Sequence, residues 1–219
     1  MAFKSRTACL VLSALALTAA DQDWKNKQFA EWTEEDAKDL LKDSPWVKTI
    51  AATLVKPSGK DLQVSSPIGR KRRREKSDTA APANAKPPML TLRWESALPV
   101  REAELKARDI TAPTLDDEDH YAIAVYGIPR GMLKDDSKGM ADELKRQALL
   151  KREGKKDTKP SSVEILLRDD GPVVLYLFPK SAEFDWRDHK IEFDAQMPGL
   201  KFTQAFSFDD MTFHGKLEL

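Results

Sequence analysis

Three histidines, one cysteine and many carboxylates are the side chains of this 219-residue chain that could take part in chemistry. His120, His189 and His214 do not belong to a recognised metal-binding motif. The chain has no phosphate-binding glycine loop, no dinucleotide fingerprint and no nucleophile elbow, since no glycine flanks Ser96 at the required spacing. Local motifs therefore assign no catalytic residue, no cofactor and no metal ligand.

A site assembled from distant residues is the alternative. Its candidates are polar residues on expected turns near neighbouring strand ends, where side chains can converge. They are Asp188, His189, Asp209, Asp210 and His214. If several of them lined one cleft, they would favour a hydrolase-like enzyme with a carboxylate and histidine site.

Four consecutive acidic residues, 116–119, precede His120. A calcium-binding EF-hand loop needs alternating oxygen ligands and a glycine at its sixth position. Here the carboxylates are contiguous and Tyr121, Ala122 and Ile123 follow, so we expect no dedicated calcium site.

The N-terminus has the pattern of a secretory signal peptide. Lys4 and Arg6 form a basic region, residues 7–20 are uncharged, and Thr18-Ala19-Ala20 supplies small residues before a cleavage point at Asp21. Fourteen uncharged residues are too few to cross a bilayer, which takes about 20. We expect residues 1–20 to be removed, giving a periplasmic or secreted protein without a transmembrane span.

The single cysteine, Cys9, lies inside this segment, near the start of the apolar run. A lipid-attached cysteine would follow that run, so we do not expect lipidation. The mature chain then has no disulfide, no thiol nucleophile and no cysteine-bound zinc. Lys+Arg and Asp+Glu are both 36, so no net charge steers the chain towards nucleic acid or membranes.

Residues 56–88 contain five prolines, many basic residues and few large apolar ones, a composition typical of disorder. The basic run within them comprises Arg70, Lys71, Arg72, Arg73 and Arg74. It lacks interleaved aromatic residues for base stacking, so we expect no specific nucleic-acid binding. A solvated loop is one interpretation, and a weak contact with an anionic surface is the other.

The remaining chain alternates between helical and strand patterns. Val173–Phe178 is an unbroken apolar run between a turn and a proline, which predicts a strand covered on both faces. Further strands are expected at 47–55, 89–95, 120–127, 161–167 and 190–194, and at 202–208 and 211–219, with turns at 169–171 and 197–199. Arg93 and Glu95 are expected on the opposite face of their strand from Trp94, and Ile191 and Phe193 are expected to point inward. Helices are expected at 33–44, with a capping box of Thr33 and Asp36, from Pro99 to 107 and over 138–153.

We predict an α+β fold: a mostly antiparallel sheet with a C-terminal meander, two helices packed on one face, and a short N-terminal helix. Residues 1–20 are the signal peptide and 21–46 an N-terminal helical segment that Trp46 docks onto the domain. Residues 47–219 form a single α+β domain, interrupted by the basic loop at 56–88.

Four stretches resemble a family of exported proteins from acidobacterial genomes. They are 32–46, with Trp32-Thr33 and Ser44-Pro45-Trp46; 94–103, with Trp94-Glu95-Ser96-Ala97-Leu98-Pro99; Phe178-Pro179; and 211–219, ending Gly215-Lys216-Leu217-Glu218-Leu219. The resemblance implies a bacterial source and an envelope location, and it supplies no active-site residue. We therefore expect a non-catalytic binding module of the envelope or secreted fraction, with a hydrolase-like enzyme as the alternative.

Overall fold

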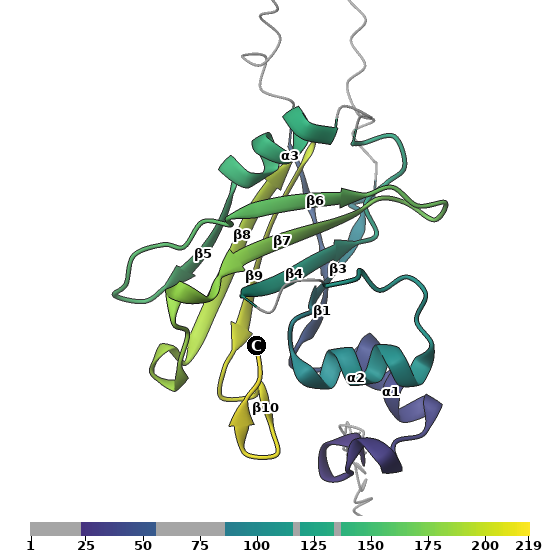
Figure 1. Ribbon diagram of the computed structural model, residues 1–219. Helices are drawn as coiled ribbons and strands as arrows, with labels where there is room; N and C mark the ends of the chain where they lie inside the picture. Colours follow the sequence, from purple (N-terminus) through teal and green to yellow (C-terminus); the bar gives the residue numbers. More distant parts are fainter. Residues whose placement is uncertain (1–22, 56–85, 116–118, 134–136) are drawn as a thin grey trace, which may run out of the picture.

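The computed structural model describes residues 23–55, 86–115, 119–133 and 137–219 (Figure 1). The expected signal peptide, the basic run at 70–74 and the acidic residues 116–118 lie outside the described residues. The described chain forms two larger antiparallel sheets, one two-stranded sheet and three α-helices, which confirms an α+β fold. Within the described residues, no helix has the length and apolarity to cross a membrane.

The larger sheet has five strands in the order β1-β3-β4-β7-β6. Their bounds are β1 (Val47–Ala51), β3 (Met89–Trp94), β4 (His120–Tyr126), β7 (Val173–Pro179) and β6 (Ser162–Leu166). The apolar run of β7 is buried from Val173 to Tyr176 and again at Phe178, and it pairs with β4 and β6. The expected central strand, covered on both faces, is confirmed.

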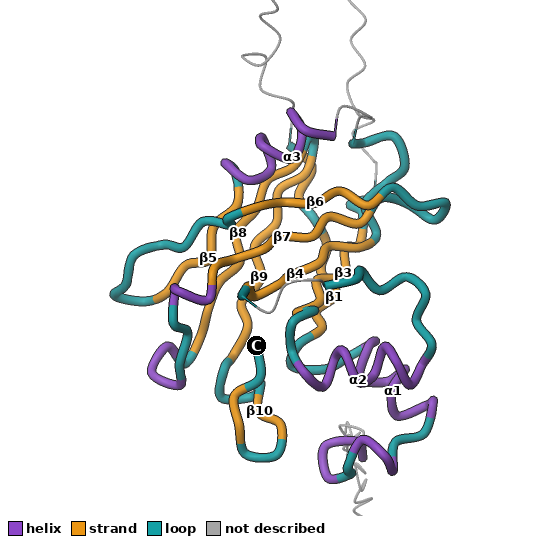
Figure 2. The backbone as a smooth tube through the Cα atoms, in the orientation of Figure 1, coloured by secondary structure: helices purple, strands orange, loops and turns teal. Residues whose placement is uncertain are grey.

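The second sheet has four strands in the order β2-β9-β8-β5 (Figure 2). Their bounds are β2 (Thr53–Leu54), β9 (Leu200–Ser207), β8 (Lys190–Met197) and β5 (Ala148–Arg152). The expected C-terminal meander is therefore wrong, because β6 and β7 belong to one sheet and β8 and β9 to the other. The chain also changes sheets at buried Ala52, between β1 and β2.

The helix expected at 138–153 is shorter than predicted. Helix α3 (Ser137–Arg146) ends before Gln147, and β5 follows it at once. Ala148 and Leu150 turn inward while β5 pairs with β8 from Ala195 to Ile191. Residues 148–152 form a strand, although their apolar spacing fits a helix, because the edge of β8 offers unpaired backbone groups that β5 satisfies.

The core lies between the two sheets and is rich in aromatic rings. Trp94 meets Phe206 edge-on at a centroid distance of 5.4 Å, and Tyr176 meets Phe193 at 5.1 Å. The alternation of Ile191 and Phe193 into this core is confirmed, since both are fully buried. Edge-to-face packing of this kind adds a favourable contact beyond the burial of area.

The N-terminal helix α1 (Glu34–Lys42) begins with the expected capping box. The amide of Asp36 donates to the Thr33 hydroxyl at 3.0 Å, and the amide of Thr33 donates to the Asp36 carboxylate at 2.8 Å. Helix α1 packs on α2 (Leu98–Ala107), while α3 packs on β6 and β8. The expectation of two helices sharing one face is therefore wrong.

Trp46 is fully buried, as expected, and its ring lies 5.8 Å from that of Trp24. Its indole N–H donates to the carbonyl of Glu218 at 2.7 Å, which anchors the end of the described chain. That end is a hairpin of β10 (Thr212–Phe213) and β11 (Lys216–Leu217), where a single strand was expected. His214 and Gly215 both have positive φ, so the chain reverses between them.

Candidate functional site

The five polar residues predicted to converge do not form one cleft. His189 and Asp209 approach each other, with Nδ1 3.3 Å from Oδ1, but both side chains are exposed. Asp188 is buried and pairs with Arg152 at 3.4 Å and Lys155 at 2.6 Å. His214 lies on the separate β10–β11 turn. Across the described ranges, no group of three or more His, Cys, Asp or Glu side chains has an arrangement that could hold a metal ion.

A buried charge cluster forms instead on the outer face of the larger sheet. It comprises Arg93, Glu95, Glu104, Asp109 and Tyr126. Arg93 is only 5 % exposed. Its Nε donates to Glu95 at 2.7 Å and its Nη1 to Asp109 at 2.9 Å, while Tyr126 donates to Glu95 at 2.5 Å. One guanidinium therefore faces three carboxyl groups in a site with little water.

Protonation of Glu104 would reduce the excess of carboxylate charge around the single guanidinium of Arg93. Its Oε1 lies 3.1 Å from Nη2 of Arg93 but lacks hydrogen-bond geometry, and Oε2 of Glu95 is likewise buried without a donor. Burial, followed by the hydrogen bond and the charge of Glu95, raises the pKa of Glu104 to about 10, against the smaller lowering effect of Arg93. Glu104 is therefore the carboxyl of the cluster that binds a proton most readily, and a proton between Glu104 and Glu95 would supply the donor that their unpaired oxygens lack.

Asp109 behaves in the opposite way. Burial raises its pKa, but hydrogen bonds from Thr111 and Arg93 outweigh burial and hold the pKa below its ordinary value. Within one cluster, the pKa of Asp109 is thus lowered and that of Glu104 is raised. The pair illustrates how environment separates two carboxyls of similar intrinsic acidity.

The cluster fixes the segment 108–115 that follows α2. Arg108 takes a left-handed conformation, with φ 53°, and ends the helix. The carboxylate of Asp109 accepts from the amide of Thr111 at 2.9 Å. Arg168, from the β6–β7 hairpin, donates to the carbonyl oxygens of Thr111 and Ala112. The segment is therefore held from both sides, although it has no regular secondary structure.

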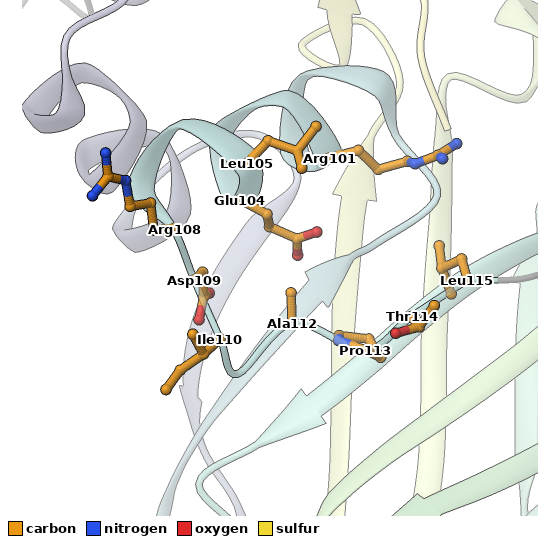
Figure 3. A pocket seen from close by; sticks show the side chains of 10 residues that line it. All are labelled: Arg101, Glu104, Leu105, Arg108, Asp109, Ile110, Ala112, Pro113, Thr114 and Leu115. Carbon is orange, nitrogen blue, oxygen red and sulfur yellow. The ribbon is translucent and has the colours of Figure 1, made fainter.

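A hollow of about 470 Å³ lies between α2 and this segment; we call it the α2 hollow (Figure 3). Glu104 points from the helix towards the segment, and Asp109 lies opposite. Leu105 is 75 % exposed and Ile110 is 95 % exposed, the two highest values among the large apolar residues that the structure describes. Arg101 and Arg108 also line the hollow and are exposed.

Sequence reasoning did not identify this site. It placed Arg93 and Glu95 on the opposite face of their strand from Trp94, which is correct, but it assigned no partners to them. An arginine and a glutamate two residues apart on a central strand were the available signal. Which residues would cover them could not be read from the sequence, because Glu104 and Asp109 come from a helix and a loop that pack there.

One other hollow brings together a serine, a histidine and a carboxylate. His120, Ser162 and Glu164 line a space of about 220 Å³ on the outer face of the larger sheet. His120 lies on β4 and the other two on β6, with β7 between them. Strands two places apart are separated by about 10 Å, which is too far for a serine and its general base to pair without a large shift.

A third hollow, of about 530 Å³, lies between the 180–186 segment and the C-terminal hairpin, and three aromatic residues line it.

The comparisons with known proteins leave the function to be argued from this geometry: no protein-family model, curated protein or solved structure matches the chain.

Proposed function

We propose that this chain is an exported, non-catalytic binding module of the bacterial envelope or secreted fraction, related to acidobacterial exported proteins. In this proposal it engages a protein partner through the α2 hollow. The observation that carries the proposal is the side chain of Ile110, which is 95 % exposed on a segment fixed by buried charges. Because the backbone on either side of Ile110 is already held by hydrogen bonds, a partner that covers this side chain does not have to order the segment.

The surroundings of Ile110 favour a partner that is apolar at its centre and acidic at its edge. Leu105 extends the apolar surface across the hollow, and Arg101 and Arg108 supply positive charge beside it. Large apolar anchors with arginines nearby are typical of the parts of an interface that contribute most to affinity.

Photo-crosslinking tests this proposal. A photoreactive phenylalanine analogue replaces Ile110 in the full chain, expressed in the cells that encode it. The matched control places the analogue at Leu54, which is 41 % exposed on β2. We expect one discrete adduct from position 110, no such adduct from position 54, and loss of the adduct when Arg101 and Arg108 are both changed to Glu. Equal labelling from both positions would contradict the proposal. So would an adduct that persists when Arg101 and Arg108 are changed to Glu.

The basic run from Arg70 to Arg74 supports a second, weaker contact with an anionic surface. Five basic residues in sequence favour such a contact, and salt should screen it. Deleting residues 70–76 should reduce binding to anionic vesicles at low salt. Unchanged binding would remove this part of the proposal.

The hydrolase alternative now rests on the hollow lined by His120, Ser162 and Glu164. A fluorophosphonate probe distinguishes it, because the probe modifies only an activated serine. Labelling that disappears in Ser162→Ala would favour the enzyme; the separation of β4 and β6 predicts no labelling.

A further inference from the structure

The hollow beside the C-terminal hairpin has an aromatic wall, and we call it the aromatic hollow. Trp186 is 46 % exposed, whereas the other four tryptophans are at most 2 % exposed. Tyr121 and Phe184 line the same hollow, with ring centroids 4.7 Å apart and planes inclined by 33°. An indole left in water beside two other rings is a surface that a flat, partly apolar ligand can cover.

The polar lining of the aromatic hollow is balanced in charge. Lys180 and Lys216 supply two cations, and Asp185 and Glu218 supply two carboxylates. A wholly apolar ligand would take these four charged groups out of water, which is costly. A charged ligand would gain little from a site with two charges of each sign. A neutral ligand rich in hydroxyl groups can donate to the carboxylates and accept from the ammonium groups at once.

The wall that carries Trp186 is held in place by buried ionic contacts. Trp186 begins the short helix η4 (Trp186–Asp188), and Asp188 pairs with Arg152 of β5 and with Lys155. The guanidinium of Arg152 lies 4.9 Å from the centre of the Phe184 ring and donates to the carbonyl of Ala182 at 3.1 Å. Asp188, one of the candidates for the alternative hydrolase site, therefore supports this wall.

The opposite wall is fixed as well. The hydrogen bond from buried Trp46 to the carbonyl of Glu218 and the bond from the amide of Glu218 to Met211 hold the hairpin against the core. With both walls in place before any ligand arrives, binding does not have to order them.

We propose that the aromatic hollow binds a neutral oligosaccharide. One face of a pyranose ring presents C–H groups of slight positive charge, which pack on the negative face of an aromatic ring, here the exposed indole of Trp186. The ring hydroxyls point outward, towards Lys180, Lys216, Asp185 and Glu218. This inference is independent of the α2 hollow and adds a second binding site to the chain.

Fluorescence of the purified full chain tests the proposal directly. Iodide quenches exposed indoles, so quenching reports chiefly on Trp186. Soluble oligosaccharides of glucose, of xylose and of N-acetylglucosamine, at millimolar concentration, are the probes. We expect at least one to protect Trp186 from iodide. Trp186→Ala should weaken that binding, measured by calorimetry, at least about tenfold, and Trp186→Phe should restore part of it.

Three controls keep the result interpretable. Trp186→Ala must retain the circular dichroism of the parent chain; if it does not, Lys216→Ala, an exposed change in the same hollow, replaces it and should weaken binding several-fold. Leu98→Ala removes a similarly exposed apolar side chain elsewhere and should change nothing. Ile110→Ser should leave sugar binding intact, because Ile110 lines the α2 hollow and not the aromatic hollow.

Three outcomes would overturn the proposal: no probe protects Trp186, binding is unchanged in Trp186→Ala, or peptides protect Trp186 while every oligosaccharide fails. The last result would assign the aromatic hollow to a protein partner.

Discussion

Oε1 of Glu104 lies 3.1 Å from Nη2 of Arg93, within ion-pair distance, yet this oxygen has no hydrogen-bond partner. Arg93 already donates to Glu95 and Asp109, and Glu95 faces Glu104 with a buried oxygen. A proton on Glu104 costs less than a third negative charge in the same buried space. This arrangement holds α2 and the segment 108–115 on the sheet, and it leads to two of the predictions below.

Glu104→Gln should stabilise the protein, and the gain should grow with pH. The folded state holds a proton on Glu104 with a pKa of about 10, against an ordinary value of 4.5. The contribution of Glu104 to the free energy of unfolding is therefore at its maximum below pH 4.5. It falls by at most about 1.4 kcal/mol per pH unit as the pH rises towards 10. A neutral amide avoids that loss, so we expect a gain of about 1–3 kcal/mol at pH 7 and little change near pH 4.5.

Urea unfolding at pH 5, 7 and 9 measures this effect. Glu35→Gln, on the exposed side of α1, is the matched control and should show no pH-dependent gain. A loss of stability in Glu104→Gln of similar size at every pH would mean that Glu104 is ionised and paired with Arg93.

Arg93→Met should destabilise the protein by about 3–5 kcal/mol, because it leaves Glu95 and Asp109 buried without their cation. Urea unfolding gives the free energy, and hydrogen exchange should show faster exchange in α2 than in β8. The control is Arg101→Met, which replaces an exposed arginine of α2. It should change the free energy of unfolding by less than about 0.5 kcal/mol. Equal effects of the two substitutions would show that the cluster contributes no net stability.

Trp46→Phe should loosen the C-terminal hairpin. The substitution removes the donor to the Glu218 carbonyl and part of a fully buried ring, at a cost of about 1–3 kcal/mol. Amides of Leu217 and Glu218 should exchange faster than in the parent chain, while those of β7 keep their protection. If exchange rises uniformly, the indole contributes only to the general core.

Gly127→Ala should be strongly destabilising. Gly127 has φ +77°, and an added Cβ would lie 2.5 Å from the carbonyl oxygen of Met89, so the β3–β4 pairing would have to shift. Gly154→Ala is the matched control, because Gly154 has φ +69° with open space around it. Thermal unfolding should show a cost of about 1–2 kcal/mol for the control, from the left-handed backbone alone, and a clearly larger one for Gly127→Ala.

Local patterns accounted for much of the fold. The alternation at Ile191 and Phe193, the apolar run of β7 and the capping box at Thr33 were all read correctly, because each depends on neighbouring residues in the chain. The turn residues 197–199 and 169–171 also lie where the sequence predicted them.

Pairing between distant segments decided the rest. Residues 148–152 carry a pattern that fits a helix, and they become β5 because the edge of β8 is there to pair with them. The two hollows also depend on contacts between distant segments, which the sequence does not show. Arg93 and Trp186 are ordinary residues in sequence, and their surroundings come from segments up to about 60 residues away, brought close only when two sheets close over one core.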